Sequence, residues 1–117
     1  MLVVDDDPAM REMLRVHLCN AGYLVSMAED AVEAGRLMLA MTPDLLIIDV
    51  EMPYLDGVEF VRAMRSEAAF ASIPVLMISA NDEHARHAAS LECRFLPKPI
   101  LKDTLLQWVS DALASEG

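Results

Sequence analysis

Chemically active side chains follow four separate apolar runs of this chain. Three acidic residues (5–7) follow residues 1–4, Asp49 follows residues 45–48, Ser79 follows residues 75–78, and Lys98 comes shortly after residues 94–96. Carboxylates that crowd together resist ionisation unless a cation neutralises them. Oxygen ligands without His or Cys favour Mg²⁺ or Mn²⁺ over zinc. These residue types therefore predict a site for Mg²⁺ or Mn²⁺, provided that the chain brings them together.

A lysine beside such a site indicates phosphoryl chemistry. Lys98 and the metal can neutralise phosphoryl oxygens, and Ser79 can donate a hydrogen bond to one of them. Asp49 can attack as a carboxylate nucleophile, because aspartyl phosphates are a known type of covalent intermediate. Asp7 is left out of the metal site, since it precedes Pro8 as a helix-capping residue.

The elements that must position these groups alternate along the chain. Predicted strands cover residues 1–4, 23–27, 45–48, 75–78 and 94–96, and predicted helices cover residues 8–20, 31–41, 58–65, 82–91 and 101–112. Five alternations of strand and helix are typical of an α/β fold, in which helices cover both faces of a parallel sheet. The carboxyl ends of its strands share one edge, where ligands bind.

Composition narrows the class of protein. The length of 117 residues predicts a single domain over residues 1–117, and the tail fits either a natural C-terminus or a cut before another domain. A net charge of −10 argues against direct nucleic-acid binding. No apolar run is long enough to span a membrane, and we expect Cys19 and Cys93 to be reduced thiols in a cytoplasmic protein.

Four segments, taken in order, carry a resemblance to a known family. They are residues 3–8 (Val-Val-Asp-Asp-Asp-Pro), residues 43–57 from Pro43 through Asp49 to Gly57, residues 75–80, and residues 95–99 (Phe-Leu-Pro-Lys-Pro). Together they resemble the receiver domain of two-component response regulators over almost the whole chain. The resemblance implies a three-layer, doubly wound, flavodoxin-like fold with a five-stranded parallel sheet in the order 2-1-3-4-5.

The resemblance also implies residue roles, assigned position by position. Asp49 matches the position of the family's phosphoacceptor, and Lys98 matches the phosphate-binding lysine. The resemblance also implies a cis peptide bond between Lys98 and Pro99. Ser79 matches the switch hydroxyl and Phe95 the switch aromatic. The Mg²⁺ ligands would be Asp6, Asp49 and the main-chain carbonyl of Glu51, with Asp5 acting through water. Leu91, where the family usually has a glycine that ends the fourth helix, departs from the pattern.

The implied function is a phosphorylation switch rather than an enzyme with an external substrate. Such a chain takes its phosphoryl group from a histidine kinase or phosphotransfer protein, catalyses only its own phosphorylation and dephosphorylation, and acts on an output domain or partner. Phosphorylation would alter the surface from the fourth to the fifth helix. The last helix has an apolar stripe (Leu101, Leu105, Trp108, Val109, Ala112), with Leu106 and Leu113 to one side of it and Trp108 to the other. This arc is wide enough to leave an edge for a second copy or an output domain, although lateral burial explains it equally well.

Two alternatives come from other functional classes. A phosphohydrolase with an aspartate nucleophile would use Asp49 with Glu51 as general acid, and a receiver-like interaction module would never be phosphorylated. Glu51 also lies near the water route to the phosphoryl group, so we expect its charge to alter the phosphoryl lifetime. His84 and His87 supply too few ligands for a metal at their spacing, which favours a solvent-facing helix surface.

Overall fold

The computed structural model describes residues 1–52 and 55–114. The predicted turn marker Pro53 and the tail at 115–117 lie outside these ranges. The helices are α1 (Pro8–Asn20), α2 (Ala31–Ala40), α3 (Gly57–Arg65), α4 (His84–Ser90) and α5 (Lys102–Ala114). The strands are β1 (Leu2–Val4), β2 (Ser26–Ala28), β3 (Leu46–Asp49), β4 (Glu51–Met52), β5 (Leu55–Asp56), β6 (Val75–Ser79) and β7 (Arg94–Pro97).

Five of the strands form one parallel sheet in the spatial order β2-β1-β3-β6-β7. Counted along the chain, these five strands stand in the order 2-1-3-4-5, which confirms the predicted topology. The register pairs Asp49 with Ile78, and Ser79 with Pro97. The residues that end β3, β6 and β7 therefore lie at the same edge of the sheet.

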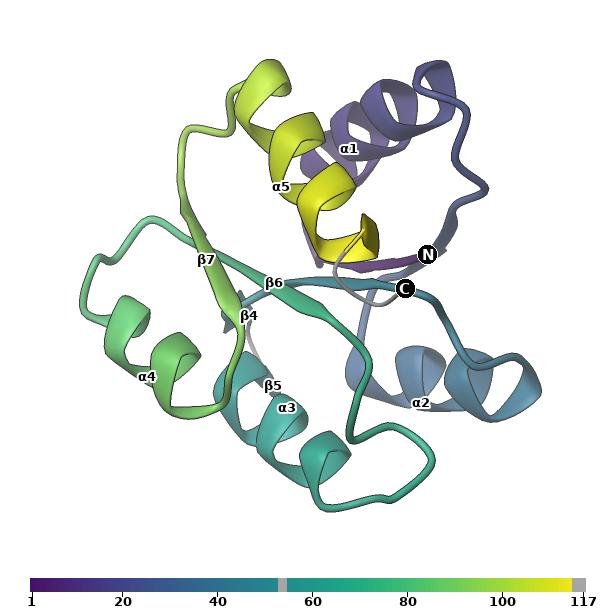
Figure 1. Ribbon diagram of the computed structural model, residues 1–117, viewed down its shortest axis with the longest axis vertical. Coiled ribbons are helices and arrows are strands. Elements are labelled where there is room, and N and C mark those ends of the chain that lie inside the picture. Colours follow the sequence, from purple (N-terminus) through teal and green to yellow (C-terminus); the bar gives the residue numbers. More distant parts are fainter. Residues whose placement is uncertain (53–54, 115–117) are drawn as a thin grey trace.

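Helices cover both faces of the sheet, with α1 and α5 on one side and α2, α3 and α4 on the other (Figure 1). Alternate residues of the central strands point to opposite faces because side chains in a strand have a period of two. Ile48 therefore belongs to the core under α2–α4, whereas Ile47 belongs to the core under α1 and α5. Both faces of the sheet are buried under helices, which explains why the central strands are continuous apolar runs.

The observed elements differ from the predicted ones at the second strand. The strand begins at Ser26 rather than at Tyr23, because Tyr23 completes the C-terminal cap of α1 by donating its amide to the Leu18 carbonyl at 3.1 Å. Leu24, an exposed residue, accepts a hydrogen bond from the N-terminal amine of Met1 at 2.8 Å. Pairing of β1 and β2 in register begins with Leu2 and Ser26, and β2 therefore begins there.

Two further differences concern the short hairpin and the last helix. β4 and β5 form a two-stranded antiparallel hairpin that begins two residues after Asp49, where the sequence predicted only a loop and turn. In α5, Leu105, Val109 and Ala112 are buried as predicted, but Leu101 precedes the helix and is 64% exposed. The apolar stripe of α5 is thus shorter than the sequence suggested, whereas Leu106, Trp108 and Leu113 along its sides are half-buried and pack against the core under α1 and α5.

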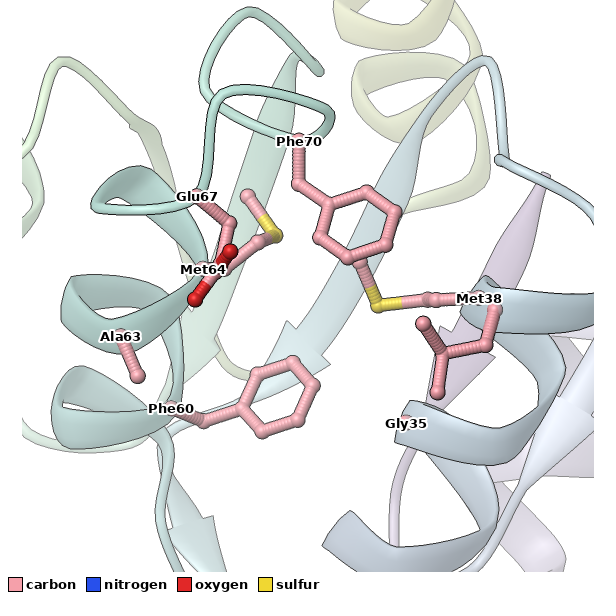
Figure 2. A pocket seen from close by; sticks show the side chains of 8 residues that line it. Gly35, Met38, Phe60, Ala63, Met64, Glu67 and Phe70 are labelled. Carbon is pink, nitrogen blue, oxygen red and sulfur yellow. The ribbon is translucent and has the colours of Figure 1, made fainter.

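A cavity of about 420 Å³ lies between α2 and α3, away from the strand-end edge. Figure 2 shows Met38 of α2 and the rings of Phe60 and Phe70 turned toward one another across it. Gly35 lines the α2 side, where an added Cβ would meet no atom within 4 Å. Among the described residues, no helix is long and apolar enough to cross a membrane.

Candidate functional site

The strand-end edge brings a lysine and a buried carboxylate into contact. Lys98, just after β7, places its Nζ 3.1 Å from Oδ2 of Asp49 at the end of β3. The Asp49 side chain is 2% exposed and that of Lys98 is 25% exposed. Burial by itself would lower the pKa of Lys98, but the hydrogen bond and charge of Asp49 outweigh it and raise that pKa. The lysine is therefore a permanent cation at neutral pH.

Two further carboxylates complete an acidic cluster. Asp5, Asp6 and Asp49 each offer one oxygen, and these oxygens lie within 4.8 Å of one another. Asp5 is fully buried, and its Oδ2 has no hydrogen-bond partner within the described part of the chain. Burial raises the pKa of Asp5 to about 6, helped by the charges of Asp49 and Asp6, although the Asp7 amide opposes the shift.

This acidic cluster fits a divalent cation. An unpartnered buried carboxylate oxygen is costly unless a cation or proton satisfies it. All three side chains are hard oxygen donors, the kind that Mg²⁺ and Mn²⁺ prefer. The Glu51 carbonyl, predicted as a further ligand, belongs to β4, two residues after Asp49.

Local packing fixes the position of Asp49. Its Oδ1 accepts a hydrogen bond from the Glu51 amide at 3.0 Å, and the Val50 amide donates to the Ile78 carbonyl at 2.9 Å. α3 begins at Gly57, where a Cβ would stand 2.8 Å from Cα of Val50 and 2.9 Å from the Asp49 carbonyl oxygen. A glycine is thus needed for α3 to start this close to the end of β3.

Ser79 lies at the same edge and is engaged by several groups. Its hydroxyl donates to Oε1 of Glu51 at 2.5 Å and lies 2.7 Å from Nδ1 of His84. The same Oε1 of Glu51 accepts the Ala80 amide at 2.8 Å. These two hydrogen bonds, with Ser79 the larger cause, hold the pKa of Glu51 below its usual value. Glu51 is therefore an anion at neutral pH.

The remaining predicted residues flank this edge. Phe95 of β7 is half-buried and packs against the core under α2–α4. The Lys98–Pro99 peptide bond is cis, as the resemblance implied. Asp7 caps α1 by accepting the Ala9 amide at 2.9 Å, which is the role predicted for it. Cys19 and Cys93 are both free thiols.

Sequence reasoning missed one neighbour of the site. His84 was predicted to face solvent on a polar helix, but it is half-buried and contacts the Ser79 hydroxyl. The error arose because α4 begins at His84 rather than near Asp82, so His84 sits on the first turn beside the end of β6. The spacing of five residues from Ser79 across one short loop was the available signal.

Comparisons with known proteins agree with this arrangement. The family "Response regulator receiver domain" matches residues 1–110. The response regulator MprA of Mycobacterium ulcerans is 42% identical over 109 residues, which are 91% of this chain and 46% of that protein. The chain spans about half the length of the curated relatives that it matches.

Solved structures give the same result. The chemotaxis response regulator CheY4 of Vibrio cholerae is 33% identical, with a TM-score of 0.88 and 96% of each chain covered. A response regulator receiver protein from Pseudomonas putida is 31% identical, with a TM-score of 0.84, 94% of this chain covered and 93% of that chain. The chain therefore belongs to the response regulator receiver domain family, whose members are phosphorylation-dependent switches of two-component signalling.

Proposed function

We propose that Asp49 is the phosphoacceptor of this receiver domain. The observation that carries the proposal is the Lys98 ammonium 3.1 Å from Asp49 Oδ2, next to the carboxylates of Asp5 and Asp6. A nucleophilic carboxylate, a fixed cation and a cation-binding cluster are the components that phosphoryl transfer requires. All of them lie at the edge formed by the carboxyl ends of β1, β3 and β7.

The transfer itself is a displacement at phosphorus. A carboxylate oxygen of Asp49 forms the new P–O bond while the P–N bond of a phosphohistidine breaks, and the leaving imidazole keeps the electron pair and takes up a proton. Lys98 holds a positive charge beside the developing phosphoryl oxygens. The contact with Lys98 also orients Asp49 before the donor arrives, which lowers the entropic cost of the step.

Asp5, Asp6, Asp49 and the Glu51 carbonyl are the groups that would hold Mg²⁺ or Mn²⁺, with Asp5 acting through water. When bound, the ion supplies charge neutralisation for the phosphoryl oxygens. The unpartnered Oδ2 of Asp5 supports this assignment. The carboxylates of this edge repel an incoming anion, and a bound cation would offset that repulsion.

Signalling would follow from Ser79 and Phe95. Ser79 is fully buried and stands at the end of β6, next to the strand that carries Asp49. We propose that its hydroxyl moves to a phosphoryl oxygen and that the Phe95 ring turns inward. These changes would bias two conformations of the surface formed by α4, β7 and α5.

The wider biology also belongs to the proposal. The phosphoryl group would come from a histidine kinase or phosphotransfer protein in the cytoplasm, and the surface of α4, β7 and α5 would act on an output domain, a partner or a second copy. The domain would catalyse only its own phosphorylation and dephosphorylation. Glu51, which a phosphohydrolase would need as general acid, is held by Ser79 and Ala80, which favours the switch over that alternative.

Intact-mass measurement tests the proposal. With Mg²⁺ and a small phosphodonor such as acetyl phosphate, the native chain should gain one phosphoryl group and Asp49→Asn none. Asp44→Asn is the matched control, because it removes an exposed carboxylate before β3 and should be phosphorylated normally. A phosphoryl adduct on Asp49→Asn would contradict the proposal, and release of many phosphates per chain from a phosphate ester would favour the phosphohydrolase.

A further inference from the structure

Glu51, two residues after Asp49, holds its carboxylate against the end of β6. Its main-chain amide donates to Asp49, and its side-chain Oε1 accepts both the Ser79 hydroxyl at 2.5 Å and the Ala80 amide at 2.8 Å. One anionic oxygen thus receives two donors from the end of β6. Hydrogen bonds to charged acceptors are roughly twice as strong as neutral ones, so this contact is a substantial part of the resting site.

The hydrogen-bonding capacity of Ser79 is fully used in this arrangement. A hydroxyl has one proton to donate and two lone pairs. The Ser79 proton goes to Glu51, and its oxygen accepts the Asn81 amide at 2.9 Å. The longer contact of the hydroxyl with the Asn81 carbonyl, at 3.3 Å, competes weakly for the same proton. His84 Nδ1 lies 2.7 Å away and can donate to the second lone pair when it carries a proton.

A phosphoryl oxygen on Asp49 would need the same donors. The proposed function gives the Ser79 hydroxyl to the phosphoryl group, and a backbone amide such as that of Ala80 is the other donor at the end of β6. Neither proton can serve Glu51 and the phosphoryl group at full strength together, because each forms one good hydrogen bond. Two anions that compete for the same donors would also repel each other.

We propose that the Glu51 carboxylate is a built-in competitor of the phosphoryl group, occupying the Ser79 hydroxyl and the Ala80 amide until phosphorylation displaces it. Displacement would also break the contact between Ser79 and His84, and so release the first turn of α4. The inference rests on the proposed function and deepens it, because it identifies what the phosphoryl group must replace. It predicts that Glu51 weakens binding of phosphoryl-like anions and couples their binding to α4.

Hydrogen exchange of the Ala80 amide tests the resting contact in cation-free protein. Ala80 is exposed, so its protection should depend on Glu51. The Ala80 amide should exchange roughly threefold to tenfold faster in Glu51→Ala than in the native chain, which is the factor expected for the loss of one hydrogen bond. Glu51→Gln keeps an acceptor oxygen and should retain most of the protection. Unchanged exchange in Glu51→Ala would overturn the inference.

Affinity for beryllofluoride, a phosphoryl analogue, tests the competition in the presence of Mg²⁺. Glu51→Ala should bind the analogue about threefold to tenfold more tightly than the native chain. Glu51→Gln should gain clearly less, since its amide oxygen still occupies both donors. Glu83→Ala is the matched control, because it removes an exposed carboxylate at the start of α4 and should bind like the native chain.

The outcomes separate this inference from the proposed function. Equal affinities of native and Glu51→Ala chains, with Asp49 phosphorylated normally, would overturn the inference alone. An equal gain in beryllofluoride affinity in Glu51→Gln and Glu51→Ala would also overturn it. The gain would then come from removing the negative charge of Glu51 and not from freeing the two hydrogen-bond donors. A native chain that is not phosphorylated on Asp49 would overturn the proposed function, whatever the Ala80 exchange shows.

Discussion

Gly57 has a structural role that its place in a turn sequence does not show. A Cβ at this position would stand 2.8 Å from Cα of Val50 and 2.9 Å from the Asp49 carbonyl oxygen, and both are backbone atoms that cannot rotate away. Gly35 in α2 is the opposite case, because a Cβ there would meet nothing within 4 Å. The two glycines therefore form a matched pair for substitution.

We predict that Gly57→Ala lowers the free energy of unfolding by about 1–3 kcal/mol, the usual cost of overpacking, and slows phosphorylation of Asp49. Gly35→Ala should raise the free energy of unfolding by about 0.5–1 kcal/mol, because alanine is the better helix former. Urea denaturation measures both values. A stabilised Gly57→Ala chain would show that α3 can move away from β3 at no cost.

The chemically active residues at the strand-end edge were the most predictable feature of this molecule. Asp5, Asp49, Ser79 and Lys98 lie at one edge because each follows an apolar strand, and strand ends are visible in the sequence. The engagement of Ser79 by Glu51 and His84 was not predictable. It depends on side-chain rotamers and on where α4 begins, and neither leaves a periodic pattern.

At the scale of elements, Arg65 links the end of α3 to two other segments, one just before β6 and one between α4 and β7. From the end of α3 its guanidinium donates to the Ile73 carbonyl at 2.6 Å and the Ala71 carbonyl at 3.0 Å, both before β6. It also donates to the Leu91 carbonyl at 3.1 Å, in the turn between α4 and β7. One cation thus satisfies carbonyls that no helix or strand ladder reaches.

The turn that Arg65 holds contains Leu91, the residue singled out in the sequence as a departure from the family pattern. Leu91 stands where a glycine was expected, and the next residue, Glu92, has the left-handed conformation with φ of 58°. The Cys93 amide closes this cap onto the Ala88 carbonyl at 2.8 Å. A non-glycine residue in this conformation costs about 1 kcal/mol, and the contact between Arg65 and Leu91 offsets that cost.

We predict that Arg65→Ala lowers the free energy of unfolding by about 2–3 kcal/mol, because the carbonyls of Ile73 and Leu91, which take part in partly buried hydrogen bonds, lose a charged donor. Arg62→Ala is the control, since Arg62 occupies the same last turn of α3 and pairs with Glu59 at the exposed helix surface. It should change stability by at most about 0.5 kcal/mol. Thermal or urea unfolding measures both values. If the two variants lose the same free energy of unfolding, the effect comes from the positive charge near the C-terminus of α3 and not from the hydrogen bonds of Arg65.

Helices and strands were predictable where the pattern of their own residues determines their position. The buried runs of β3 and β6 appeared in the sequence as continuous apolar segments, whereas β2 was misplaced because pairing with Met1 and β1 decides where it begins. The β4–β5 hairpin has two residues per strand, too few for an alternating pattern. Tertiary pairing, rather than local preference, sets both of these boundaries.

At the scale of the whole molecule, negative charge and cation binding are coupled. The chain carries a net charge of −10, and the cluster of Asp5, Asp6 and Asp49 gathers three of its carboxylates at one edge. Self-repulsion of this kind destabilises the folded state. A bound divalent cation would relieve it and would stabilise the fold by mass action, about 2.7 kcal/mol at a concentration 100-fold above Kd.

The pKa of Asp5 gives this coupling a defined pH window. The folded chain keeps a proton on Asp5 up to about pH 6, whereas the ordinary pKa is 3.8, so the folded state binds more protons between these values. The free energy of unfolding of cation-free protein must then fall as pH rises through the window. The loss attributable to Asp5 is at most about 3 kcal/mol, and Asp5→Asn, which does not titrate, should lack it.

We therefore predict that Mg²⁺ stabilises the native chain more above pH 6 than below pH 4, because the cation needs the ionised form of Asp5 that the cation-free fold disfavours. Thermal unfolding with MgCl₂, against NaCl of equal ionic strength, measures the effect without general screening.

Asp44→Asn removes an equal charge far from the cluster and should keep the full response to Mg²⁺, whereas Asp49→Asn should lose most of it. Equal stabilisation by NaCl, or a response that Asp49→Asn retains, would mean that the ion acts on the net charge of the molecule and not at the strand-end cluster.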